Sequence, residues 1–230
     1  MTEQPPPGRG SATDLLSRVL ITPVLPRPRL RRLVRLYTGL VLYGLSAALL
    51  VHAELGSMPW DVLHQGLSHQ TGLSIGTWNV LVGSMLMLLW IPLRQKPGLG
   101  TLSNVIVVGL TMDLFLRSLP ESDSLWVRVA LLGLGVVVCA VATGCYIGAR
   151  LGPGPRDGLM TGLAARGWSV RLARTVIEVV VVITGFLLGG TVGVGTLVFA
   201  LAIGPLAHVF LPLLSMRERV EHTVPDPSAS

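Results

Sequence analysis

Charged residues are scarce in this chain: only 13 % of its residues are Asp, Glu, Lys or Arg, whereas 50 % are hydrophobic. A soluble globular domain carries about 25 % charged residues. The mean hydropathy of +0.66 is correspondingly high, and the apolar runs between the charges approach the roughly 20 residues that span a bilayer as helix. The shortage of charge therefore excludes a soluble globular fold and predicts a polytopic membrane protein.

The sequence also lacks the residue clusters that disulfide frameworks, metal sites and common catalytic centres need. Its two cysteines, Cys139 and Cys145, fall on different faces of one predicted helix and cannot easily pair. No metal-ligand spacing, nucleophile elbow, zinc-protease motif or dinucleotide fingerprint is present. We therefore expect neither an enzyme nor a bound metal or cofactor, although an intramembrane enzyme with an unfamiliar site stays open.

The excess of positive charge, +6 with an isoelectric point near 10.3, does not indicate nucleic-acid binding. The arginines flank apolar segments and do not form a stripe with interleaved aromatic residues. Orientation of the chain in a lipid bilayer explains them better, so we expect no nucleic-acid partner.

What the sequence does contain is one unit present twice. The stretch LGSMPWDVLHQGL at 55–67 returns as LGPGPRDGLMTGL at 151–163, with seven residues unchanged at a constant offset. After a slip of one residue the match resumes. The pairs in the later part are Gly72 with Gly167, Ser74 with Ser169, Gly98 with Gly193, Gly100 with Gly195, Thr101 with Thr196 and Gly109 with Gly204.

Six apolar segments predict transmembrane helices, three in each copy of the repeat. They are 33–53, 75–91, 102–119, 125–149, 170–188 and 197–214. Val51-His52-Ala53 resembles a signal cleavage site, but the first apolar run is long for a signal sequence and the repeat requires it as a helix. The predicted organisation is an Arg/Pro-rich cytoplasmic arm (1–32), membrane repeats at 33–119 and 125–214, and a cytoplasmic tail (215–230).

Positive charge predicts the orientation of these helices. Seven arginines lie between Arg9 and Arg35, the connections 94–96 and 150–174 hold two and five cations, and the tail holds two. With both termini in the cytoplasm of a bacterial cell, sixteen of the eighteen cations lie inside. The arm, with a short surface helix expected at 14–25, would then rest on anionic lipid.

Three helices per copy is an odd number, so the second copy should insert upside down relative to the first. The loop 54–74 holds no Lys or Arg, whereas its counterpart 150–174 is rich in arginine, which agrees with inversion. Inverted repeats recur in secondary transporters, with the site between the repeats. The predicted fold is therefore all-α, with six transmembrane helices as two inverted three-helix repeats, each with a short interfacial or re-entrant helix.

Each repeated stretch should begin a short helix that carries an aspartate in its first turn. The tripeptides PWD at 59–61 and PRD at 155–157 follow turn-forming glycines, and proline suits the first helical position. If both helices dip into the membrane, Asp61 and Asp157 would hold a solute or ion at a central site. The alternative, which we favour, is that both aspartates face water and stabilise the helix ends.

The Gly-x-Gly-Thr motifs open the third helix of each copy. Threonine is a reasonable N-cap residue and glycine allows close backbone approach, whereas phosphate binding is a weak interpretation because the P-loop lysine is missing. The residues interpreted as structural are Pro59, Trp60, Pro155, Gly100, Thr101, Gly195 and Thr196.

Polar residues inside the predicted spans are further binding candidates, because burying a charge in lipid is costly unless it is paired or hydrated. Glu178 follows Arg174 by one helical turn, so an ion pair is the alternative. For Asn79 and Asn104 the alternative is hydrogen bonding between helices. Asp113 and His208 occupy equivalent positions, but inversion would place them near opposite faces. The full candidate set is Asp61, Asp157, Glu178, Asn79, Asn104 and Arg156.

These motifs resemble those of the YczE/YyaS/YitT group of bacterial integral membrane proteins. The resemblance lies in Leu55-Gly56 with the PWD tripeptide, Gly72-x-Ser74-x-Gly76, and the second-copy stretch from Gly152 to Met160. It covers about residues 33–215 and is strongest with the YczE branch. The resemblance implies a bacterial cytoplasmic-membrane protein and supplies no catalytic or binding residues.

These observations favour a transporter or permease-like protein for a small solute or ion. The alternative is a non-transporting membrane partner or regulatory scaffold, with the arginine-rich arm as its docking surface. The bilayer is the one certain partner class, and a chain this small would work as a monomer or as a symmetric homodimer.

Overall fold

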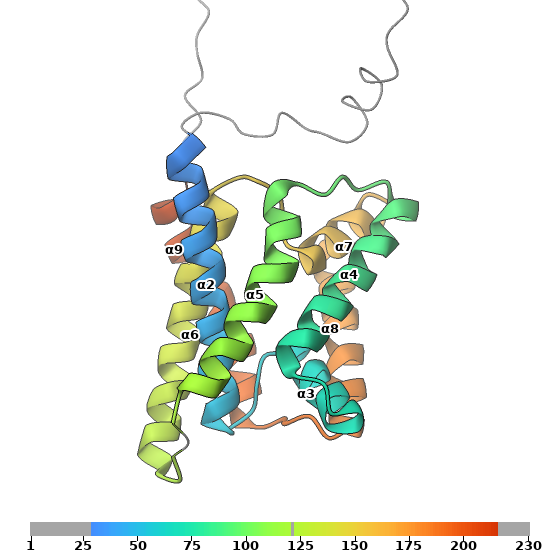
Figure 1. The fold of residues 1–230 in the computed structure, drawn as a ribbon. Coiled ribbons are helices and arrows are strands. Elements are labelled where there is room, and N and C mark those ends of the chain that lie inside the picture. Colours follow the sequence, from blue (N-terminus) through green and yellow to red (C-terminus); the bar gives the residue numbers. More distant parts are fainter. Residues whose placement is uncertain (1–28, 121, 216–230) are drawn as a thin grey trace, which may run out of the picture.

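The computed structural model describes residues 29–120 and 122–215. Within these ranges the chain forms eight helices and no strand (Figure 1), which confirms the predicted all-α fold. The helices are α2 (Arg29–Ala53), α3 (Pro59–Thr71), α4 (Ile75–Leu93), α5 (Leu99–Ser118), α6 (Leu125–Gly148), α7 (Pro155–Ala164), α8 (Val170–Leu187) and α9 (Val194–Leu214). The surface helix expected at 14–25 and most of the predicted tail lie outside the described residues.

Five of the described helices are long and apolar enough to cross a membrane, namely α2, α4, α5, α6 and α9. The remaining predicted span coincides with α8, which has 18 residues. Arg171, Arg174 and Glu178 all lie in its N-terminal half, so α8 is not among the apolar spans. The prediction of six apolar spans is therefore met by five helices, and α8 departs from it because its N-terminal half carries three charged residues.

Two long helices, α2 and α6, pack along each other on one side of the described bundle (Figure 1). Glycine permits this approach, since a Cβ atom on Gly39 would lie 2.7 Å from the backbone nitrogen of Tyr146. α5 packs on α2, α9 packs on α6, and buried side chains from these four helices form the largest hydrophobic cluster. On the other side, α3 packs against α8 and α7 against α4 (Figure 1).

The two short helices begin in the same way at opposite ends of the bundle (Figure 1). Each has proline in its first turn. The connection before each helix turns through two residues with positive φ: Glu54 (52°) and Gly56 (113°) before α3, Arg150 (54°) and Gly152 (123°) before α7. A glycine at the second position avoids the strain that a side chain would cause there, which explains why Leu-Gly recurs in both copies.

Each connection binds the start of the last long helix of the other copy. The backbone N–H of Gly195 donates to the carbonyl of Leu55, and that of Gly100 donates to the carbonyl of Leu151, both at 2.7 Å. No side chain fits at these contacts, because a Cβ atom on Gly98 would lie 2.4 Å from the oxygen of Leu151. The repeated glycines thus join the two copies to each other.

The threonines of the Gly-x-Gly-Thr motifs act differently from the prediction. The N-caps of α5 and α9 are Gly98 and Gly193, and Thr101 and Thr196 lie three positions later, where each hydroxyl accepts from the N–H of its N-cap glycine. The Thr101 hydroxyl accepts from the N–H of Gly98 at 3.2 Å and donates to the carbonyl of Pro153 at 2.7 Å. The motif therefore caps a helix and also ties it to the opposite copy.

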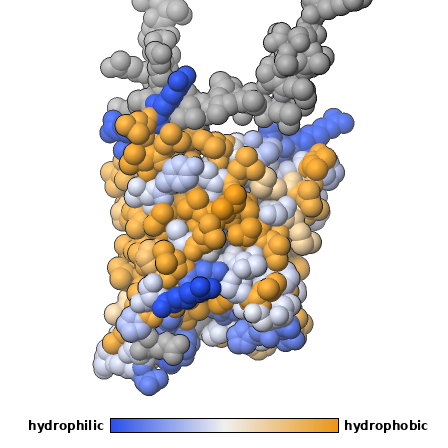
Figure 2. Space-filling view, viewed as in Figure 1, coloured by the Kyte–Doolittle hydropathy of each residue, from blue (hydrophilic) through white to orange (hydrophobic). Residues whose placement is uncertain are grey.

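Hydrophobic side chains cover much of the face shown in Figure 2, and hydrophilic side chains are more frequent toward the two ends. Exposed leucine, isoleucine and valine side chains occur along α4, α5, α8 and α9. An exposed apolar surface of this extent is what a bilayer requires of the helices that it surrounds.

Candidate functional site

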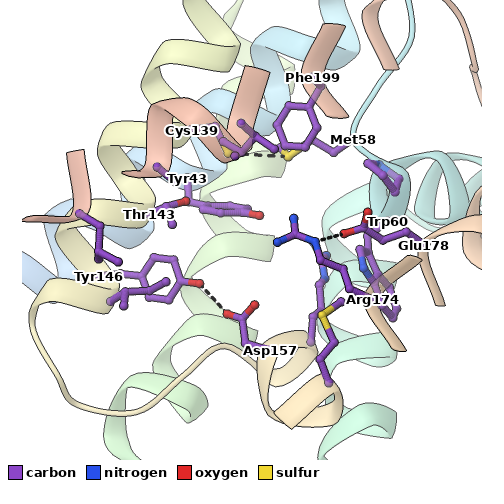
Figure 3. Close-up of a pocket in the computed structure, with 18 residues that line it drawn as sticks. Tyr43, Met58, Trp60, Cys139, Thr143, Tyr146, Asp157, Arg174, Glu178 and Phe199 are labelled. Carbon is purple, nitrogen blue, oxygen red and sulfur yellow. Dashed lines mark hydrogen bonds and ion pairs between the residues drawn. The ribbon is translucent and has the colours of Figure 1, made fainter. Parts of the chain in front are cut away.

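A cavity of about 230 Å³ lies between the two copies of the repeat (Figure 3). Its walls come from α2, α6, α8 and α9, together with the N-terminal ends of α3 and α7. The first turns of the two short helices therefore reach one cavity, although the helices lie at opposite ends of the bundle. A smaller cavity of about 50 Å³, between α2, α4, α5, α6 and α7, shares several residues with the larger one.

On α7, Asp157 lines both cavities. Its Oδ2 atom accepts a hydrogen bond from the Tyr146 hydroxyl at 2.9 Å (Figure 3). The Tyr146 ring stands edge-on to that of Tyr43, with 6.1 Å between ring centroids and 81° between ring planes. Tyr146 of α6 thus holds the Asp157 carboxylate at the cavity wall, and Tyr43 of α2 packs against Tyr146.

Arg156, the residue before Asp157, connects the two short helices. Its guanidinium carbon lies 5.1 Å from the centroid of the Trp60 ring on α3. A guanidinium over an indole face is a favourable cation–π arrangement. Both residues line the cavity, and they occupy equivalent positions of the two Pro-x-Asp motifs.

α8 brings a second arginine and a second carboxylate to the cavity. The Nε atom of Arg174 donates to Oε1 of Glu178 at 2.9 Å. The end of the Arg174 guanidinium projects into the cavity on the side of Tyr43 (Figure 3). The side chains of Arg174 and Glu178 are 55 % and 27 % exposed, so the ion pair faces an open part of the cavity. The intrahelical pair considered from the sequence is present, and it also lines the cavity.

Asp61 lies behind the cavity wall, only 1 % exposed. Its Oδ1 atom is 3.2 Å from Nδ1 of His64, which is fully buried. The other polar atoms of the pair, Oδ2 of Asp61 and Nε2 of His64, have no hydrogen-bond partner among the described residues. Asp61 therefore does not face water, as the capping interpretation required, and it does not line the cavity.

Asn79 and Asn104 both line the smaller cavity, beside Arg156 and Asp157. The structure thus brings five of the six sequence candidates to two adjoining cavities and leaves Asp61 behind the wall. Asp113 is elsewhere: its carboxylate accepts from the Ser74 hydroxyl and from the N–H of Gly76, at the start of α4. Among the described residues, no group of three His, Cys, Asp or Glu could hold a metal ion.

Sequence reasoning missed three polar contributors. Tyr43 and Tyr146 were not singled out, although tyrosine hydroxyls in predicted spans of a chain with 5 % aromatic residues could have marked them. His64 was also missed as the partner of Asp61. Its signal was the i, i+3 spacing from an aspartate in the first turn of a helix.

These features define a class: a helical membrane protein with a charged cavity between two related halves. The family model described as "Family of unknown function (DUF6198)" matches residues 30–212, and the chain belongs to this family. An uncharacterized protein of Haemophilus influenzae is 39 % identical over 178 residues, which cover 77 % of this chain and 82 % of that one.

Two proteins of Bacillus subtilis are also similar. The uncharacterized membrane protein YczE is 30 % identical over 76 % of this chain and 83 % of its own length. The uncharacterized protein YyaS is 30 % identical over 76 % of this chain and 90 % of its own length. The resemblance to the YczE/YyaS group is thereby confirmed, and the chain is a membrane protein of that group. No solved structure gives a significant match.

Proposed function

We propose that the protein is a secondary transporter or permease-like protein for a small solute or ion. The observation that carries the proposal is the cavity at which the first turns of α3 and α7 converge from the two copies. Short helices that enter from opposite sides toward a site between inverted repeats are a recurring plan in such proteins. Ionisable residues at membrane depth are expensive, and they usually mark a solute or ion path.

In this proposal α8 is the sixth membrane helix, and its charges are tolerated because Arg174 and Glu178 face the cavity instead of lipid. The two copies then have opposite orientations in the bacterial cytoplasmic membrane, with both termini in the cytoplasm. The arginine-rich start of α2 and the helix α7 with Arg156 lie at the same end of the bundle (Figure 1), which supports this orientation under the positive-inside rule. The protein acts without a covalent chemical step, so it is not an enzyme.

The activity is tested with purified full-length protein in proteoliposomes incubated with a defined mixture of metabolites and salts. We expect wild type to accumulate one solute class, and Asp157→Asn to abolish this accumulation, because its carboxylate lines both cavities. Arg171→Gln is the matched control, since this exposed α8 arginine lies outside the cavity lining. Absence of any protein-dependent accumulation in the wild type would reject the transport function.

The inverted topology has its own test. Cys139 and Cys145 are first replaced by alanine, and single cysteines are then placed at Gln70 near the end of α3 and at Thr161 on α7, both exposed. We expect an impermeant thiol reagent to label position 70 from outside the cell and position 161 only after the membrane is opened. Labelling of both positions from one side would contradict the inversion.

A further inference from the structure

All four charged residues that line the larger cavity come from the second copy of the repeat. The second-copy residues and their first-copy counterparts are Arg156 for Trp60, Arg174 for Asn79 and Glu178 for Gly83. A duplicated scaffold needs the same residues in both copies, as the paired glycines show. Charged residues that differ between the copies and still line the cavity are therefore better explained by a ligand than by the fold.

The two arginines offer hydrogen-bond donors that the described residues do not use. Arg174 donates to Glu178 through Nε, and the terminal nitrogens of its guanidinium project into the cavity (Figure 3). Arg156 stacks on Trp60 and donates no hydrogen bond to a described residue. The planar guanidinium fork matches a carboxylate in bidentate geometry. These unused donors therefore fit an acidic ligand group.

The two carboxylates keep acceptor capacity for a ligand as well. Asp157 accepts from Tyr146 through Oδ2, and Glu178 accepts from Arg174 through Oε1. In both groups the second carboxylate oxygen has no hydrogen bond from a described residue. With two cations and two anions, the lining has no net formal charge. A simple anion or cation would leave the lining with an uncompensated charge, whereas a ligand with one positive and one negative group would not.

The opposite wall of the cavity is apolar. Its side chains are Phe199, Ile203, Ala207 and Leu211 of α9, with Met58 packed in the same hydrophobic cluster as Phe199. The volume of about 230 Å³ is below the range of about 300–1,000 Å³ that is typical of drug-sized ligands. The cavity thus combines a balanced set of charges with an apolar wall, in a space suited to one small molecule.

From these features we propose that the cavity binds a small zwitterion of the amino-acid type with an apolar side chain. Its carboxylate binds Arg156 and Arg174, its ammonium group binds Asp157 and Glu178, and its side chain lies against α9. This assignment rests on the proposed function only in taking the cavity as the solute site.

The test is thermal stability of the full-length protein in detergent with alanine, valine, leucine, methionine or phenylalanine. Each amino acid is compared with its decarboxylated amine and its deaminated acid, for example leucine with 3-methylbutylamine and 4-methylpentanoate. We expect at least one amino acid to raise the melting temperature at a concentration where neither analogue does. Equal shifts with the acid alone, or no shift with any amino acid, would overturn the zwitterion assignment.

Substitutions then locate the binding. Arg174→Asn introduces the residue of the first copy, and Glu178→Gln removes one charge. Each should weaken binding about 10- to 100-fold, as expected for loss of a hydrogen bond to a charged group. Arg171→Asn, on the same helix but outside the lining, should leave affinity unchanged. Equal affinity in all three variants would place the ligand elsewhere.

The two proposals fail in different ways. Uptake of another solute class into proteoliposomes, without amino-acid binding, would reject the zwitterion and keep the transporter. Specific amino-acid binding that depends on Arg174, without uptake, would keep the site and reject transport.

Discussion

Helices α4 and α5 pack closely against each other and form a closed pair. The corresponding helices of the second copy, α8 and α9, barely touch, and the cavity lies between them. In the closed pair, a Cβ atom on Gly76 would lie 2.1 Å from the carbonyl oxygen of Gly109. About two turns later in α4, a Cβ atom on Gly83 would lie 3.2 Å from a methyl carbon of Val105. Glycine at position 76 lets the two backbones meet, and glycine at position 83 makes room for the side chain of Val105.

Alignment of the copies places Arg171 and Glu178 at the positions of Gly76 and Gly83. An arginine cannot occupy a site where even a methyl group meets backbone, so α8 cannot approach α9 as α4 approaches α5. The comparison teaches that one scaffold yields either a sealed helix pair or a cavity wall, and that glycine or charge at a few positions decides which.

The largest expected effect comes from adding a methyl group to the closed pair. Gly76→Ala should destabilise the protein by about 3 kcal/mol, the upper end for overpacking, because the opposing atom belongs to the backbone of α5. The matched change in the open pair, Arg171→Ala, removes an exposed side chain and should stay within about 0.5 kcal/mol. Unfolding in mixed detergent micelles measures both. Similar losses at the two positions would mean that the difference between the interfaces does not depend on these residues.

A second difference is a pair of hydrogen bonds that connects α4 to α5. Asp113 on α5 accepts from the Ser74 hydroxyl at 2.5 Å and from the N–H of Gly76 at 2.8 Å, at the start of α4. Its second-copy counterpart is His208, which is exposed.

Asp113→Ala should therefore cost about 2 kcal/mol, because it removes two hydrogen bonds to a carboxylate and leaves partly buried donors unpaired. His208→Ala should change the unfolding free energy by less than about 0.5 kcal/mol. The same unfolding measurement applies to both variants. An unchanged midpoint for Asp113→Ala would show that glycine packing alone holds α4 on α5.

Much of the helical framework could be predicted from the sequence because local residue patterns determine where the helices begin and how long they are. Apolar length gave the long helices, and proline after glycine gave the starts of α3 and α7. Apolar length also predicted α8, as the segment 170–188, but the three charged residues in its N-terminal half keep it out of the apolar spans. These local patterns do not show which helices pack against each other.

The cavity could be predicted only in part, for the same reason. The motif aspartates marked the correct helix ends, but the identical pattern places Asp157 at the cavity and Asp61 behind its wall. That difference depends on the surroundings of each carboxylate: Asp157 binds Tyr146 of another helix, whereas Asp61 is buried beside His64 of its own helix. The repeat predicted equivalent positions for the two motif aspartates. The cavity is instead determined by the residues in which the two copies differ.

The smallest expected effect concerns a contact that joins equivalent positions of the two copies. Arg156 and Trp60 stand second in their Pro-x-Asp motifs, and the guanidinium lies over the indole ring. Two equivalent positions can meet in this way where a two-fold axis relates the copies. If so, exchanging the two residues should preserve the contact.

Trp60→Arg alone would set two guanidinium groups against each other, and Arg156→Trp alone would leave two indoles without a cation. The double exchange should recover about 0.5–1 kcal/mol of unfolding free energy relative to the sum of the single changes, the usual size of a partly exposed cation–π contact. A double-mutant cycle on purified protein measures this coupling. Additive single effects would mean that the arginine and the tryptophan occupy different environments. The two copies would then not be related by a two-fold axis at this contact, although their sequences match.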